Sequence, residues 1–182
     1  MGLAIIMTLA AAIYRLLPHP YNIAPLGAIA LLGGMYLGRR FALWVPLVVL
    51  ALTDLVLNTR MGYPLLYVPR AFDYGAFALI GMLGWCARSW STRTKLGAVA
   101  VTPLTFFLIS NFGVWLFGLN LANAPYPKTL EGLVACYAAG LPFLRGTLIG
   151  DVGFMAVFAA MAMSLRCSRN ERFNQLAGPA NA

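Results

Sequence analysis

The stretch "FALWVPLVVLALTDLVLN", residues 41–58, decides the fold class. It is an almost continuous apolar run, and its length falls within the roughly 17–25 residues that a helix needs to cross the hydrocarbon of a bilayer. One acidic residue, Asp54, interrupts the run close to its end. A charge at membrane depth is costly unless it is paired or hydrated, so Asp54 either joins two helices or belongs to a site.

The composition of the whole chain also indicates a membrane protein. Of its 182 residues, 61% are hydrophobic and 10% are charged, and the mean hydropathy is +0.79. Soluble domains have about 45–50% apolar and about 25% charged residues, so this chain cannot hide its apolar surface in one small core. We therefore predict an all-α membrane protein, with a single integral membrane domain over residues 1–182. The net charge of +8 comes from basic residues scattered between apolar runs, which argues against a nucleic-acid partner.

Six segments are apolar enough to predict transmembrane helices. They are residues 2–17, 23–38, 41–58, 72–88, 96–118 and 147–165. The first lacks the basic start and the cleavage site of a signal peptide, so we expect it to remain as a helix. The pattern Ala30-x-x-x-Gly34, together with Gly75, Gly81 and Gly84, is typical of closely packed membrane helices.

The connections between these segments alternate in charge. Short basic connections follow the second and fourth segments and a basic tail follows the sixth; they contain Arg39, Arg40, Arg88, Arg93, Lys95, Arg166, Arg169 and Arg172. The positive-inside rule places them, with both termini, in the cytoplasm. The long outer connection before residue 147 holds an interrupted apolar stretch. We expect an amphipathic or re-entrant helix there over residues 129–142, with a seventh span as the alternative.

Polar residues gather at the predicted outer ends of the helices. The candidate ligand-binding residues are Asp54, Asn58, Arg60, Tyr63, Tyr67, Asn111, Trp115, Arg145, Asp151 and His19. Other polar groups near the same ends are Arg15, Arg70, Asp73, Tyr74 and Ser110. The inner halves of the segments are almost purely apolar, so the simplest common cause is an outward-facing polar pocket with aromatic walls.

Each of these residues also has a structural alternative. Asp54 can pair with Arg145 or Arg15, and Asp151 can form a similar ion pair, to hold helices together. The tyrosines can form an interfacial aromatic belt, and Asn111 can bond a neighbouring helix.

Sequence motifs that would indicate an enzyme are weak or missing. The segment "LIGDVG" lacks the first glycine of the intramembrane aspartyl protease motif, no nucleotide-binding loop is present, and the cysteines lack metal-binding spacing. We therefore expect no catalytic residues.

Four segments resemble a family of uncharacterised bacterial membrane proteins related to the substrate-binding (S) components of energy-coupling-factor (ECF) vitamin transporters. They are "RLLPHPYNIAPLGAIALLGG", "LTDLVLN", "SNFGVWL" and "YPKTLEGLVACYAAGLPFLRGTLIGD". The resemblance covers nearly the whole chain. It implies an S-component-like bundle of six transmembrane helices with an outer binding face, a small vitamin-like substrate, and an ECF transmembrane/ATPase module as partner. S components contact that partner through an A-x-x-x-A pattern on the first span, which Ala4-x-x-x-Thr8-x-x-x-Ala12 approximates.

The nearest functional relative within this resemblance is the solitary cobalamin (vitamin B12) S component. It is similar in overall plan and in an acidic residue near the outer end of the third span, which Asp54 matches. That relative offers a cysteine to cobalt from the loop after the third span, where this chain has Tyr63 and Tyr67. His19 is the residue here that could offer a nitrogen ligand instead. The resemblance implies cobalamin as a substrate and no required cofactor.

The sequence therefore leads to three functional hypotheses. The first is an uptake protein that captures a small polar molecule from the outer side and moves it inward. The second is a non-transporting scaffold or assembly subunit, in which the acidic residues only lock helices together. The third is a membrane enzyme at the outer face, which needs Asp54 and Asp151 to converge on one water-accessible point.

Overall fold

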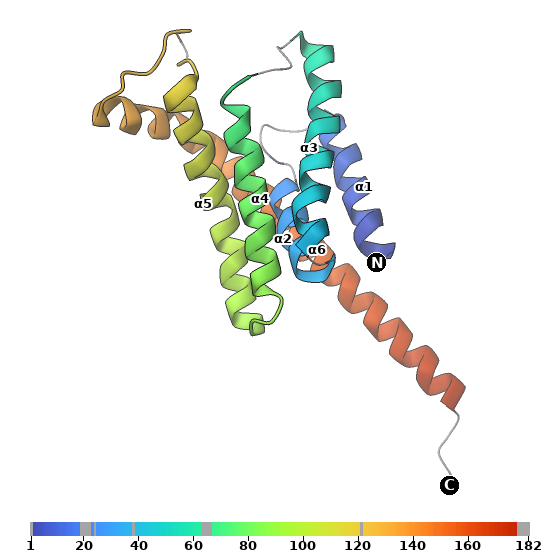
Figure 1. Cartoon of the computed structure of the whole chain (residues 1–182). Helices are drawn as coiled ribbons and strands as arrows, with labels where there is room; N and C mark the ends of the chain where they lie inside the picture. The colour runs from blue at the N-terminus through green and yellow to red at the C-terminus, as the bar shows by residue number, and fades with distance from the viewer. Residues whose placement is uncertain are drawn as a thin grey trace.

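The computed structural model describes residues 2–18, 23, 25–37, 39–62, 67–120 and 122–177, which form an all-helical fold (Figure 1). The helices are α1 (Gly2–Leu16), α2 (Leu26–Leu37), α3 (Arg39–Met61), α4 (Arg70–Ala87), α5 (Thr92–Phe117) and α6 (Leu130–Ala177). The described residues contain no strand beyond an isolated bridge between Leu119 and Pro125. The all-α prediction is confirmed, with a helix at each of the six predicted segments.

Three stretches of helix are long enough and apolar enough to cross a membrane. They are Leu43–Met61 in α3, Thr92–Phe117 in α5 and Leu130–Phe158 in α6. α1 has 15 residues and α2 has 12, so at about 1.5 Å per residue neither covers a hydrocarbon core of about 30 Å. α4 begins with Arg70 and has Asp73 in its first turn, which lowers its hydropathy. The described helices thus support about three spans by this criterion, where the sequence predicts six.

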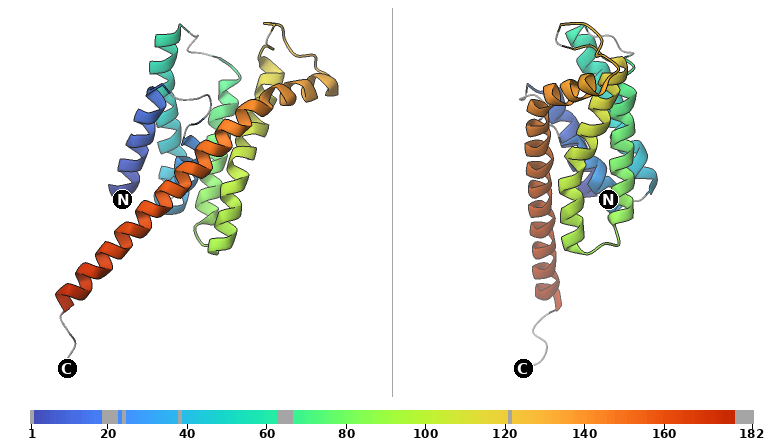
Figure 2. Two further views of the ribbon diagram at one scale, coloured as in Figure 1. Left: turned by 180° about the vertical axis from the view of Figure 1, so that it is seen from behind. Right: turned by 90° about the vertical axis from the view of Figure 1, so that its left-hand side faces the viewer.

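α6 corrects the prediction of a separate surface helix over residues 129–142 followed by a span over residues 147–165. The two form one continuous helix of 48 residues, which passes through Pro142. A proline removes one backbone hydrogen bond and bends a helix, and in Figure 2 the first part of α6 lies across the end of the bundle before the helix turns down its side. This first part packs against α5, where Gly140 leaves room for Asn111.

Consecutive helices run in alternate directions along the bundle (Figure 1). The α3–α4 and α5–α6 connections lie at one end, which we call the upper end. The start of α3 and the α4–α5 connection lie at the opposite end, which we call the lower end. This alternation groups the basic connections at the lower end and brings α3, α4 and α5 together at the upper end, where the polar residues were expected.

The short helix α2 lies at the centre of the fold and packs against all five other helices. Residues 26–31 are all buried. Small residues let the backbones approach closely, because a Cβ atom at Gly34 would collide with the backbone of α4, and one at Gly84 would collide with Leu31. Gly75 has open space around it, so only part of the predicted packing pattern is used.

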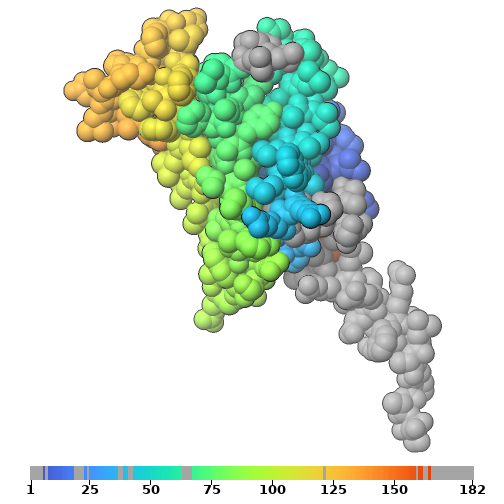
Figure 3. All heavy atoms as spheres, viewed as in Figure 1, coloured from blue at the N-terminus to red at the C-terminus, as the bar shows by residue number. Residues whose placement is uncertain are grey.

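The outer surface of the bundle is apolar. Leu9, Leu52, Leu96 and Leu108, on three different helices, are each more than half exposed. On the face shown in Figure 3, α3, α4 and α5 lie side by side and their side chains cover the surface. Apolar surface of this extent is rare on soluble monomers and is expected where lipid surrounds the protein. The fold therefore agrees with the predicted membrane character.

We expect Gly34→Ala to destabilise the protein, because the added methyl group would overlap the α4 backbone. Overpacking of this kind costs about 1–3 kcal/mol. Gly33→Ala is the matched control, since nothing lies within 4 Å of its Cβ position. Thermal unfolding of both variants in detergent, followed by circular dichroism, measures the difference. Equal melting temperatures for the two variants would contradict the close packing of α2 on α4.

Candidate functional site

Asp54 lies near the upper end of α3 and is only 7% exposed. Its Oδ1 accepts a hydrogen bond from Nη2 of Arg15, on α1, at 2.7 Å. Its Oδ2 lies 3.5 Å from Nε of Arg70 and 3.5 Å from the hydroxyl of Tyr74, both on α4. One carboxylate therefore joins α1, α3 and α4. The alternative that Asp54 pairs with Arg15 is confirmed.

Arg15 is held at two points on α3. Its Nη1 also donates to the hydroxyl of Thr53, the residue before Asp54. The Thr53 hydroxyl in turn donates to the carbonyl of Val49 at 2.7 Å, which orients it toward the helix. Arg15 stands in the last turn of α1, where a cation also interacts favourably with the helix dipole. The end of the short helix α1 is thereby fixed to α3.

Asp73 extends this group of side chains to α5. The Asp54 cluster, as we name it, consists of Arg15, Asp54, Arg70, Asp73 and Tyr74. Arg70, Asp73 and Tyr74 are spaced by three and four residues at the start of α4, so they share one face of the helix. Asp73 accepts a hydrogen bond from Ser110 of α5, and its charge interacts with both arginines. The cluster thus links four helices through two arginines and two aspartates.

One hydrogen-bond donor of Arg70 has no partner among the residues that the structure describes. Its Nη1 is buried, and no acceptor within the described ranges bonds it. Buried donors are nearly always satisfied in proteins, because an unsatisfied one costs about 1–3 kcal/mol and more when it is charged. A guanidinium also presents a planar set of donors that fits a carboxylate or a phosphate. The cluster therefore has the chemistry to accept a further anionic group at Arg70.

Tyr67 stands beside the cluster, in the connection between α3 and α4. Its hydroxyl bonds the backbone of Leu119 and so links the two upper connections. Partial burial, and then the nearby Asp73 carboxylate, raise the pKa of Tyr67 above its usual 10.0. The phenol is therefore neutral at physiological pH, and its hydroxyl can both donate and accept a hydrogen bond.

The other predicted residues of α3 and the loops differ in their position. Asn58 follows Asp54 by one helical turn on the same face and is 5% exposed, so it borders the cluster. Arg60 is exposed on the last turn of α3. His19 and Tyr63 lie outside the described residues, so a role for His19 as a cobalt ligand stays a prediction. Within the described chain, no group of three or more His, Cys, Asp or Glu could hold a metal ion.

Asn111 and Trp115 of α5 make contacts away from Asp54. The Asn111 Nδ2 donates to the carbonyl of Phe107 on its own helix at 2.8 Å, and its amide lies against Gly140 of α6. The Trp115 Nε1 donates to the carbonyl of Pro127 at 2.9 Å. Trp115 therefore ties α5 to the segment that leads into α6, whereas Asn111 packs against α6 itself.

Asp151 of α6 bonds the backbone of α2 rather than a cation. Its Oδ1 accepts the amide of Ala28 at 3.1 Å, and the amide of Gly27 also bonds this carboxylate. Asp151 is 1% exposed, and its Oδ2 has no hydrogen-bond partner among the described residues. A Cβ atom at Gly27 would overlap the carboxylate, so the close approach requires glycine. The ion-pair alternative is wrong for Asp151, since in the described chain its partners are backbone amides.

Arg145, which the sequence offers as a partner for Asp54, is exposed on α6. The ion pairs that the described residues form with Asp54 come from Arg15 and Arg70 instead. Asp54 and Asp151 also contact different helices, one through arginines and the other through amides. The two carboxylates that lie close enough to interact electrostatically are those of Asp54 and Asp73.

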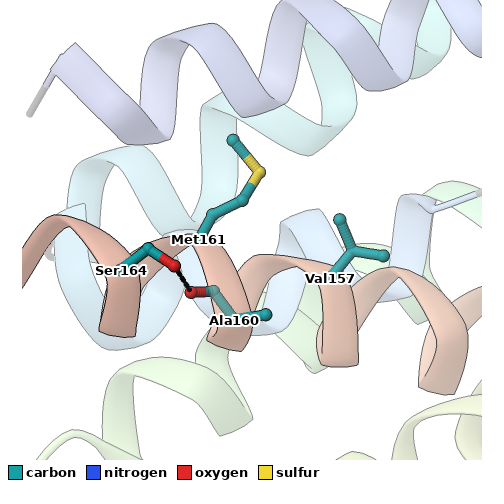
Figure 4. A pocket seen from close by; sticks show the side chains of 4 residues that line it. All are labelled: Val157, Ala160, Met161 and Ser164. Carbon is teal, nitrogen blue, oxygen red and sulfur yellow. Dashed lines mark hydrogen bonds between the residues drawn. The ribbon is translucent and has the colours of Figure 1, made fainter.

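The surface of the described chain has a shallow hollow on α6 and another on α3, and neither contains a predicted site residue. The first is lined by Val157, Ala160, Met161 and Ser164, along one face of α6 (Figure 4). In it the Ser164 hydroxyl donates to the Ala160 carbonyl at 3.0 Å. The second is lined by Arg40, Trp44, Val45, Val48 and Val49 on α3. Both are shallow and mainly apolar, unlike the polar outward-facing pocket that the sequence predicts.

A comparison with models of protein families finds a match over residues 1–175 to a family of unknown function, DUF6580. The chain belongs to the DUF6580 family. The matched region contains the whole Asp54 cluster and reaches almost to the end of α6. No curated protein and no solved structure matches the chain.

In this DUF6580 protein, the sequence correctly indicates the end of the bundle at which polar residues gather. It does not identify all the residues that form the cluster there. It places Arg15, Arg70 and Asp73 near that end without selecting them, and it selects Arg60 and Arg145, which are exposed. The spacing Arg70-x-x-Asp73, taken as the first turn of a helix, is a signal that could have found the α4 side of the cluster. No local signal marks Arg15, whose aspartate partner is 39 positions away.

We expect Arg15→Gln and Asp54→Asn to be coupled in a double-mutant cycle. Their ion pair measures 2.7 Å and both side chains are mostly buried, so each single change leaves the other charge poorly matched. Contacting residues show interaction energies of about 0.5–3 kcal/mol, and we expect a value in that range from denaturant unfolding. Arg60→Gln, which removes an exposed arginine from α3, should change the stability by less than about 0.5 kcal/mol. Strictly additive effects in the cycle would contradict the ion pair.

We expect Asp151→Asn to be tolerated and Asp151→Ala to destabilise the DUF6580 protein. Asparagine keeps an oxygen for the amides of Gly27 and Ala28, whereas alanine leaves both amides without an acceptor. Loss of a side-chain acceptor at a helix start costs about 0.5–2 kcal/mol. Unfolding of the two variants and the wild type in one detergent measures the effect. If asparagine were as damaging as alanine, the charge and not the acceptor oxygen would hold α2.

Proposed function

We propose that this protein is a membrane uptake protein that binds a small, anionic, vitamin-like molecule at the Asp54 cluster and moves it inward. The observation that supports this most is the buried Nη1 donor of Arg70, for which no acceptor is found in the described residues. A carboxylate or phosphate of the ligand would supply that acceptor through a charge-assisted hydrogen bond. The phenols of Tyr67 and Tyr74 stand beside the charged groups, in keeping with the few polar groups and aromatic walls of small-molecule sites.

A bound ligand anion would compete with Asp54 for Arg70, and this competition would couple ligand binding to the arrangement of the helices. Arg15 holds Asp54 at 2.7 Å, whereas Arg70 approaches it at 3.5 Å and is the weaker partner. A ligand anion at Arg70 would weaken this second ion pair and leave the first intact. Because the contact of Arg70 is one of those that join α4 to α3, its loss would loosen the attachment of α4 to α3. Such a ligand-dependent difference between two arrangements is what inward movement of a ligand requires.

The membrane arrangement that goes with this proposal is the six-span, S-component-like bundle, with the upper end outside and both termini in the cytoplasm. Three stretches of helix are long and apolar enough to span, and the shorter α1 and α2 would need tilt or local thinning of the bilayer. The resemblance in sequence supports a bacterial inner membrane, an ECF transmembrane/ATPase module as partner, and cobalamin as one substrate to test.

Native mass spectrometry of the protein purified gently from its own host tests the proposal. We expect the wild type to carry a small molecule and Arg70→Gln to lose it, because the substitution removes the cationic donors. Arg60→Gln is the matched control, since it removes an exposed arginine at the same end of the bundle. A wild type that carries no small molecule, or an Arg70→Gln variant that keeps it, would contradict the proposal.

Asp54→Ala is a poorer test than Arg70→Gln. Asp54 holds side chains of α1 and α4 together, so its loss is expected to lower the stability as well as any affinity. If Asp54→Ala lost the ligand, the result would not show whether Asp54 binds the ligand itself or only positions Arg70.

A scaffold or assembly subunit is the second candidate, and one observation favours it. Both oxygens of Asp54 already have partners on neighbouring helices, as expected if the residue only locks the helices together. A stable protein partner that copurifies without any small molecule would favour this function. The third hypothesis, a carboxylate-dependent enzyme, gains no support from the separate contacts of Asp54 and Asp151.

A further inference from the structure

The lower end of the bundle carries cations without acidic neighbours in sequence. These cations are Arg39, Arg40, Arg88, Arg93 and Lys95, at the start of α3, the end of α4 and the start of α5. The chain has no Asp or Glu before Asp54 and none between Asp73 and Glu131. The start of α3, the end of α4 and the start of α5, which carry these cations, therefore contribute no counter-charge of their own there.

Two of these arginines, Arg39 and Arg88, both contact the ring of Trp85. The guanidinium carbon of Arg39 lies 5.6 Å from the centre of the Trp85 ring, and that of Arg88 lies 5.2 Å from it. The cation–π contacts hold both side chains near the same indole. Neither arginine belongs to an ion pair within the described ranges, and the two positive charges repel each other. An anion that contacts both guanidinium groups would relieve the repulsion and accept hydrogen bonds from both.

An apolar hollow on α3 begins at Arg40, the residue after Arg39. It is lined by Arg40, Trp44, Val45, Val48 and Val49, which follow successive turns of α3 away from the lower end. Trp44 is 66% exposed and Val48 is 49% exposed, and in Figure 3 this part of α3 lies uncovered on the surface. The surface therefore changes from a group of cations to a shallow apolar hollow along one helix.

We propose that the lower ends of α3 and α4 form a binding site for an anionic phospholipid. In this site the phosphate of the head group contacts Arg39 and Arg88, and one acyl chain follows Trp44 and Val48 along α3. A free phosphate ion would use the same arginines but would leave the apolar hollow empty, so a lipid fits both halves of the site. Clusters of basic side chains beside membrane helices are the features that attract anionic head groups. The site is separate from the Asp54 cluster and does not depend on the proposed uptake function.

Lipid retention, measured by native mass spectrometry, tests this proposal on the full chain. The protein in mild detergent is offered equal amounts of phosphatidylglycerol and phosphatidylcholine with the same acyl chains. We expect the wild type to retain one phosphatidylglycerol with a preference of roughly tenfold. The double variant Arg39→Gln/Arg88→Gln should lose the preference. The control Arg93→Gln/Lys95→Gln removes as many charges from the same end but leaves Trp85 and its two arginines, so it should keep the preference.

Three results would overturn the proposal. One is equal retention of the two lipids by the wild type. Another is an equal loss of preference in both double variants, which would indicate general attraction to the basic end rather than a site. The third concerns Trp44→Ala, which keeps every charge and changes only an exposed side chain. We expect it to weaken phosphatidylglycerol retention, whereas unchanged retention, with displacement by inorganic phosphate, would assign the arginines to a free anion.

Discussion

The fold depends on the bond between the Asp151 carboxylate of α6 and the start of α2. α2 has only 12 residues and packs against every other helix. Its first turn therefore lies among other helices rather than in water. The first amides of a helix have no partner within it, and in a membrane each unsatisfied group costs several kcal/mol. Asp151 accepts the amides of Gly27 and Ala28, and the missing side chain of Gly27 makes room for it. A short central helix is stable here because a carboxylate from a distant segment completes it.

The two buried aspartates of the bundle are compensated in different ways. Asp54 is matched by the cations Arg15 and Arg70, which reach it from two other helices. Asp151 is matched by the dipoles of backbone amides. An external anion can compete for an arginine, whereas amides at a buried helix start cannot be given up without leaving them unsatisfied. For the proposed uptake function, we therefore expect ligand-dependent change at the upper end of the bundle, while the contact between α2 and α6 stays unchanged.

The two ends of the bundle also differ in how their charges are balanced. At the upper end, aspartates of the chain lie beside the arginines, so an incoming anion must compete with them. At the lower end, Arg39 and Arg88 share the ring of Trp85 and no carboxylate of the described chain pairs with them. The first arrangement suits exchange of a ligand, and the second suits lasting occupation by a lipid.

The sequence by itself determined the helical class, the apolar surface and the approximate place of each helix, because hydropathy and helical periodicity are local properties. It also determined that Asp54 needs a partner. Only the tertiary structure decided that residues 129–142 and 147–165 belong to one bent helix, since the course of the chain at Pro142 depends on packing against α5. It alone decided the partners of the buried carboxylates, which lie as far as 39 positions away for Asp54 and include one 123 positions away for Asp151. Those partners follow from which helices touch, and that is set by long-range packing rather than by any pattern within one helix.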